Sequence, residues 1–220
     1  MYVIGLIDDE ESQLSKMRRV IKTNEPIEVQ PYIFKSYSLS QNAGDVVAVV
    51  SDQVMQDILS SKLSALIIDY KIMIKTTKVK GTDIFRRVRE EVPKFPVIIL
   101  TEVVEESLKP VFIDADKVYK KKDFYKLESE YSKEKVANIF DSMKKYTEQK
   151  DKLQLTMREL KQKLVDSDNK NAVIEEIMVN EKELNNFIPT DQSQIEKVFD
   201  TNKIKKVITL IEQANKLLES

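Results

Sequence analysis

Three nearly continuous apolar runs alternate with stretches in which apolar residues recur at helical spacing. The runs cover residues 2–8, 63–69 and 95–101. Strands that are covered by helices on both faces have this composition, because neither face meets water. Two weaker runs, 27–35 and 115–121, predict an edge strand that contains Pro31 and a fifth strand.

Helical patterns occupy the stretches between these runs. Apolar residues fall on one face in four segments, which are 10–22, 45–61, 81–92 and 103–112. Strands that alternate with helices in this way favour an α/β fold, a doubly wound five-stranded parallel sheet with helices on both faces.

The pattern changes after Phe124. Between Val136 and Leu164, apolar residues recur at alternating spacings of three and four, with Lys150 as the polar interruption. Repeated heptads favour a coiled coil, so we predict a homodimer through residues 136–164. A long amphipathic helix that packs on its own chain is the alternative. The predicted organisation is an α/β domain, a long helix that continues its fifth helix, and an all-α C-terminal extension, at residues 1–130, 131–166 and 171–220.

Composition excludes several kinds of site and partner. Of the 220 residues, 36 are Lys or Arg and 37 are Asp or Glu, so no global charge attracts nucleic acid. Histidine is absent, which excludes His-dependent triads, His-ligated zinc and a phosphohistidine on this chain. No apolar run reaches the ~18 residues of a membrane span, and the N-terminus is typical of a strand. We therefore expect a cytoplasmic protein with no membrane partner.

Chemically distinctive side chains follow the predicted strands at the edge where the carboxyl ends of parallel strands meet. They are Asp8 and Asp9, Asp69, Thr101, and Lys121. Clustered carboxylates suit Mg²⁺, which prefers oxygen ligands. A carboxylate beside such a cation can attack a phosphoryl group and form an acyl phosphate. Each residue alone also has a structural explanation as a turn, strand or solvated residue.

The order of these motifs resembles the receiver domains of two-component response regulators. The matching segments are GLIDDEE (5–11), LIID (66–69), GTDIFRRVRE (81–90), IILT (98–101) and ADKVYKK (115–121). The resemblance covers residues 1 to about 147 and implies a flavodoxin-like sheet of strand order 2-1-3-4-5. It also implies a phosphoacceptor, a metal site and contacts with the phosphoryl oxygens. The residues are Asp69 as acceptor, Asp8, Asp9, Asp69 and the backbone carbonyl of Lys71 as Mg²⁺ ligands, and Thr101 and Lys121 as phosphoryl contacts.

The function implied is that of a phosphoryl acceptor in signalling rather than a turnover enzyme. A partner histidine kinase or phosphotransfer protein would donate the phosphoryl group, and the helices would carry the output through protein–protein contacts. No helix-turn-helix with a basic face is evident, so we expect no direct binding to nucleic acid. One alternative is a pseudo-receiver adaptor that binds partners without phosphorylation. Another alternative is a phosphatase of the haloacid dehalogenase type, which also uses an aspartate nucleophile at the end of a strand. Such an enzyme needs a second aspartate two residues later, at position 71, and this chain has Lys71 there, so we discount it.

Several positions depart from the family pattern. Lys122 stands where a proline commonly follows the lysine, and Glu102 stands where the residue after the switch hydroxyl is usually small. Val118 occupies a frequently aromatic position, while Tyr119 beside it should face the other side of the strand. The connection 70–80 is longer than usual and contains four lysines. These lysines suit either the attraction of a phosphoryl donor or partner or a solvated loop, and we favour the solvated loop.

Overall fold

The computed structural model describes residues 1–39, 46–74, 77–104, 114–166 and 170–188. Within these residues, five parallel strands form one sheet in the order β2-β1-β3-β6-β7. The strands are β1 (Tyr2–Ile7), β2 (Tyr32–Ser36), β3 (Ala65–Asp69), β6 (Val97–Thr101) and β7 (Val118–Lys120). The prediction of an α/β fold with a five-stranded parallel sheet is therefore confirmed.

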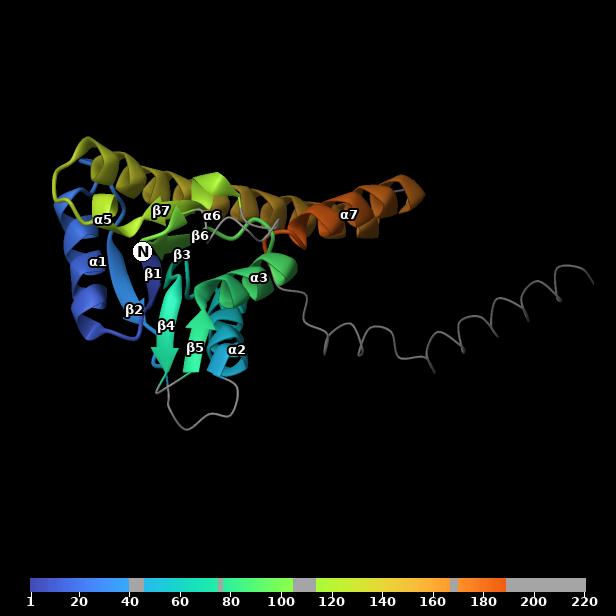
Figure 1. The fold of residues 1–220 in the computed structure, drawn as a ribbon. Helices are drawn as coiled ribbons and strands as arrows, with labels where there is room; N and C mark the ends of the chain where they lie inside the picture. The colour runs from blue at the N-terminus through green and yellow to red at the C-terminus, as the bar shows by residue number, and fades with distance from the viewer. Residues whose placement is uncertain (40–45, 75–76, 105–113, 167–169, 189–220) are drawn as a thin grey trace, which may run out of the picture. The chain divides into compact units, whose positions relative to one another are not determined.

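Helices cover both faces of this sheet (Figure 1). One face packs against α1 (Glu11–Thr23) and α6 (Glu130–Asp166), and the other against α2 (Val46–Leu59) and α3 (Gly81–Glu91). Because side chains alternate along a strand, Ile67 enters the first core and its neighbour Ile68 the second. This double burial explains why the central strands are apolar at nearly every position.

The remaining predicted helices and strands agree with the structure in most places. Helices predicted at 10–22, 45–61 and 81–92 are confirmed as α1, α2 and α3. The weak run at 27–35 forms β2 only after Pro31, and the run at 115–121 forms a short 3-10 helix, η1 (Ala115–Lys117), before β7. The helix predicted at 103–112 lies mostly outside the described residues.

An antiparallel hairpin stands between β3 and α3, where we predicted a solvated loop. It consists of β4 (Lys71–Ile74) and β5 (Thr77–Lys80). Ile72 pairs with Val79 and is fully buried in the core beneath α2 and α3. The loop prediction is wrong because this apolar anchor holds a segment that is otherwise rich in lysine.

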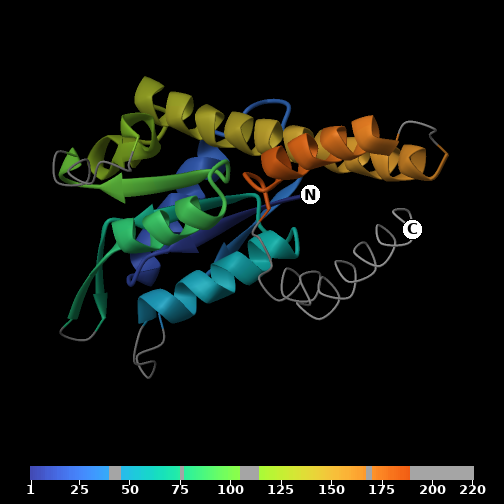
Figure 2. The ribbon, with the colours of Figure 1, turned by 90° about the vertical axis from the view of Figure 1, so that its right-hand side faces the viewer.

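The long helix α6 of 37 residues follows a single helical turn, α5 (Lys121–Phe124). Its first half packs on the sheet, and its second half lies alongside α7 (Lys170–Leu184), as Figure 2 shows. After α7 the chain returns to the α/β domain, where the Tyr146 hydroxyl donates to the carbonyl of Phe187. The backbone N–H of Lys94 donates to the carbonyl of Asn186 at 2.9 Å.

The apolar seam of α6 is covered within the chain. The buried seam residues are Val136, Ile139, Met143, Tyr146, Lys150, Met157 and Leu160. This packing matches the alternative of a long amphipathic helix that packs on its own chain. A homodimer through residues 136–164 stays a prediction, and it would have to use other faces of α6.

The predicted C-terminal helices are described only as far as residue 188. The part that spans 189–220 lies outside the described residues. Among the helices that the structure does describe, none has both the length and the apolar composition needed to cross a membrane.

Candidate functional site

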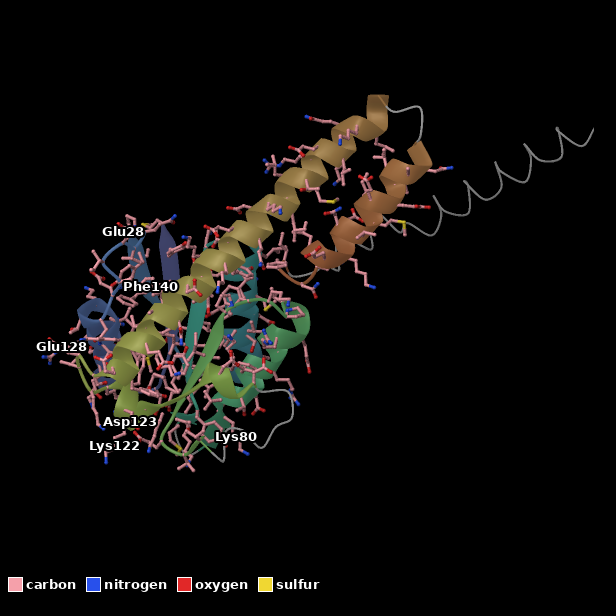
Figure 3. The ribbon with its side chains drawn as sticks, turned by 90° about the horizontal axis from the view of Figure 1, so that it is seen from above. Glu28, Lys80, Lys122, Asp123, Glu128 and Phe140 are labelled. Atoms are coloured by element: carbon pink, nitrogen blue, oxygen red, sulfur yellow. The ribbon has the colours of Figure 1, made fainter. Side chains whose placement is uncertain are left out.

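The carboxyl ends of β1, β3, β6 and β7 converge on a pocket of about 290 Å³, which we call the acid pocket. Asp8 follows β1, Asp69 and Thr101 end β3 and β6, and Lys121 follows β7. Figure 3 places Lys80, which ends β5, and Lys122, which follows Lys121, at the end of the domain away from α7. The acid pocket is lined by Asp8, Asp9, Glu10, Gln13, Asp69, Tyr70, Lys71, Met73, Thr101, Glu102 and Lys121.

Lys121 bridges the two buried carboxylates of the pocket. Its Nζ lies 2.8 Å from Asp69 Oδ1 and 3.2 Å from Asp8 Oδ2. All three side chains are at most 10% exposed, so these contacts are sheltered from water. Ion pairs of this kind stay strong in salt, unlike exposed pairs.

Backbone amides fix the remaining oxygens of both acids. Asp69 Oδ2 accepts a hydrogen bond from the Lys71 N–H at 3.2 Å, and Asp8 Oδ1 accepts one from the Glu10 N–H at 2.9 Å. Each carboxylate is thus held by the turn that follows its own strand and by Lys121, the first residue of α5 after β7. These hydrogen bonds fix the orientation of both carboxylates.

Burial and the contacts with Lys121 together set the pKa values of these groups. Burial raises the pKa of Asp69 to about 6, although the hydrogen bond and charge of Lys121 oppose the rise. Burial also raises the pKa of Asp8. For Lys121, burial favours a lower pKa, but the hydrogen bond and charge of Asp69, together with Asp8, raise it. At neutral pH Asp69, with a pKa of about 6, is mostly ionised, and Lys121, whose pKa is raised, carries its proton.

Three carboxylates of the acid pocket could hold a metal ion together. Oxygen atoms of Asp8, Asp9 and Asp69 all lie within 4.8 Å of one another. This all-oxygen donor set fits a hard divalent cation. A cation would also offset the burial cost that raises the pKa of Asp69 and Asp8.

The backbone at the start of α3 lies close to the backbone at the end of β3, and this contact places α3 next to the acid pocket. The Gly81 N–H donates to the carbonyl of Tyr70 at 2.9 Å. A Cβ on Gly81 would lie 2.1 Å from the carbonyl oxygen of Asp69. Glycine is therefore required where the hairpin rejoins the sheet and α3 begins.

Thr101 and Glu102 occupy the β6 side of the acid pocket. The Thr101 hydroxyl is buried and lies 3.2 Å from both the N–H and the carbonyl oxygen of Val103. Glu102 is exposed at the pocket's lining. Thr101 is thus placed at the predicted edge, while its hydroxyl is engaged by its own turn.

The structure also tests the predicted facing of β7. Val118 packs into the core beneath α2 and α3, and Tyr119 into the core beneath α1 and α6. The prediction that Tyr119 faces away from Val118 is confirmed. In place of a turn after a proline, Lys121 and Lys122 begin α5.

Sequence reasoning missed two residues near the acids. Burial, and then the charges of Asp8, Asp69 and other nearby acids, raise the pKa of Tyr125, and its buried hydroxyl has no hydrogen-bond partner in the described part of the chain. Tyr125 follows the single turn of α5 and carries no sequence signal. Met73 lines the pocket from β4, and the alternation along β4 could have revealed it.

Comparison with known proteins adds no relative. No family model matches the chain, and no curated protein matches it. The resemblance to receiver domains therefore rests on the ordered motifs and on the site that these residues build.

Proposed function

We propose that this chain is a phosphoryl-accepting receiver of two-component signalling with the flavodoxin-like fold. The observation that carries the proposal is Lys121, which hydrogen bonds to both Asp69 and Asp8 at the carboxyl edge of a parallel sheet. The donor is a phosphohistidine on a partner histidine kinase or phosphotransfer protein, because this chain contains no histidine.

Asp69 is the nucleophile in this proposal. One carboxylate oxygen attacks phosphorus, the P–N bond to the donor imidazole breaks, and the released imidazole nitrogen takes a proton from solvent. At neutral pH Asp69 is mostly ionised, so it needs no base. The Lys71 N–H and Lys121 orient its two oxygens.

Charge balance comes from the residues around Asp69. Lys121 is 2.8 Å from the acceptor carboxylate and supplies a positive charge beside the transferred group. The Thr101 hydroxyl can contact a phosphoryl oxygen after it turns away from Val103. Mg²⁺ held by Asp8, Asp9, Asp69 and the Lys71 carbonyl would neutralise phosphoryl oxygens.

The output in this proposal passes through helices rather than through DNA. α6 begins six residues after the short helix that Lys121 opens, so the site and the helical extension are linked along the chain. A second copy of the chain and an unidentified protein are the expected partners. Their contacts would use faces of α6 and α7 that the chain itself leaves uncovered.

A pseudo-receiver adaptor is the second candidate. The exposed carboxylate of Glu102 favours it, because it adds negative charge to the lining of the acid pocket, where an anionic donor enters. Such a protein would keep the fold and bind partners through its helices without phosphorylation.

Intact-mass spectrometry separates the two candidates. The protein is incubated with acetyl phosphate, with and without Mg²⁺, beside Asp69→Asn and the control Asp151→Asn, an exposed acid on α6. The receiver proposal expects one added phosphoryl group in the wild type and the control, dependent on Mg²⁺ and lost in Asp69→Asn. No addition under any condition, with beryllofluoride also failing to bind, would favour the adaptor.

A further inference from the structure

Met73 stands out among the residues that line the acid pocket. All the other residues of its described lining carry oxygen or nitrogen in their side chains, whereas Met73 offers only carbon and sulfur. It is 47% exposed, so hydrophobic burial does not explain its place.

Met73 also lines a second hollow beside the acid pocket. A second hollow of about 370 Å³ extends from the acids toward Ser36 and Leu39, at and beyond the end of β2. Its lining shares Asp8, Asp9 and Met73 with the acid pocket, and no other residue is common to both linings. Met73 therefore lies at the boundary between the two hollows, and it is the apolar residue among the three that they share.

The register of β4 fixes this position. Side chains alternate along a strand, so burial of Ile72 directs Met73 to the opposite side. Ile72 is fully buried and paired with Val79, and Tyr70 just before the hairpin is also buried. The hairpin thus presents Met73 from an anchored base rather than from a loose loop.

We propose that Met73 is a specificity-determining residue that limits the access of water to the acyl phosphate on Asp69. This inference rests on the proposed function. In hydrolysis, a water oxygen bonds to phosphorus, the P–O bond to the Asp69 carboxylate breaks, and the water releases a proton to solvent. The products are the free carboxylate and inorganic phosphate.

An apolar wall slows this step for a physical reason. Attacking water must be held by hydrogen-bond partners, and Met73 offers only a weakly accepting sulfur and no donor. Truncation of Met73 would join the two hollows and admit ordered water beside Asp69. The inserted hairpin would then serve to lengthen the life of the phosphorylated state.

Four variants of the 220-residue chain test this inference. Each protein is phosphorylated with acetyl phosphate and Mg²⁺, desalted, and followed by intact mass as the phosphoryl group is lost. Met73→Ala and Met73→Gln should shorten the half-life at least about threefold, the second because its amide holds water. Met73→Leu keeps an apolar side chain of similar volume and should match the wild type. Leu155→Ala, an exposed apolar residue of α6, is the control and should also match.

Several results would overturn the inference. Equal or longer half-lives in Met73→Ala and Met73→Gln would refute it and leave the proposed function standing. A half-life shortened equally in Met73→Leu would show that shape, not exclusion of water, matters. Failure of the wild type to accept any phosphoryl group would refute the proposed function, and this inference with it. Thermal unfolding of each variant confirms that an exposed substitution left the fold intact.

Discussion

Replacement of Asp69 by Asn should stabilise the protein in the absence of metal. The pKa of Asp69 rises from its ordinary 3.8 to about 6, chiefly through burial. The folded state therefore binds this proton more tightly than the unfolded state, and stability falls as pH increases from about 4 to about 6. At pH 7.5 the full free-energy cost of burying the ionised Asp69 carboxylate is present. Asn removes this cost because its uncharged amide resembles the neutral acid.

The pKa change sets the magnitude of this effect. At about 1.4 kcal/mol for each pKa unit, the rise to about 6 corresponds to about 3 kcal/mol. Asn also weakens the contact with Lys121, which lies 2.8 Å from Asp69. We therefore expect Asp69→Asn to raise the free energy of unfolding at pH 7.5 by about 1 to 3 kcal/mol.

Urea unfolding followed by circular dichroism measures this difference. The wild type, Asp69→Asn and the control Asp151→Asn are compared in EDTA at pH 7.5 and again at about pH 4. The advantage of Asp69→Asn should shrink at the lower pH, where the wild-type carboxyl is protonated. Mg²⁺ should stabilise the wild type more than the variant, because binding favours the folded state. A variant that is no more stable at pH 7.5, or whose advantage does not depend on pH, would refute the reasoning.

Three further predictions concern the packing around the site and the extension. Gly81→Ala should lower the free energy of unfolding by about 2 kcal/mol or more, measured by urea unfolding, because its Cβ would meet the Asp69 carbonyl oxygen at 2.1 Å. Phe187→Ala should lower the free energy of unfolding by about 3 kcal/mol. It should also speed proteolytic cleavage after α7, because buried Phe187 anchors the chain that returns from this helix. An unchanged cleavage rate would contradict this anchoring. For the homodimer through residues 136–164, sedimentation should show a mass that falls when Leu155, an exposed apolar residue of α6, becomes Glu. A monomer at every concentration would rule the dimer out.

The residues of the acid pocket could be predicted from the sequence because the order of the strands is enough to bring them together. Apolar runs mark central strands, parallel strands share one carboxyl edge, and so Asp69 and Lys121, 52 positions apart, meet. No pairing information beyond strand order was needed. The same reasoning placed Asp8 and Thr101 at that edge.

The hairpin escaped prediction because its signal is short. Four lysines among residues 70–80 suggested a solvated segment, but Ile72 is fully buried and anchors β4 in the core. A two-stranded sheet forms only where such an anchor exists, and the anchor's partners come from distant helices. The place of Met73 at the pocket depends on the same anchor, because burial of Ile72 sets which side of β4 Met73 faces.

The long helix shows a different limit. Heptad spacing predicts that one face of α6 is buried. It does not identify whether that face packs against a second copy of the helix or against another part of the same chain. Lys150, which interrupts the seam, illustrates the point. Its Nζ donates to Ser61 Oγ at 3.2 Å within the same chain, next to the ring of Tyr146. A polar seam residue that suggested the register of a dimer thus has an intrachain partner 89 positions away.

The central claim is that Asp69 itself carries the phosphoryl group, and chemical mapping tests it most directly. The protein is treated with acetyl phosphate and Mg²⁺, reduced with borohydride, digested and sequenced by mass spectrometry. Reduction converts an acyl phosphate of aspartate to homoserine and leaves free carboxylates unchanged. Homoserine at position 69, and at no other acid, is the predicted result. Modification at Asp8, Asp9 or Glu102 instead, or none at all, would contradict the account.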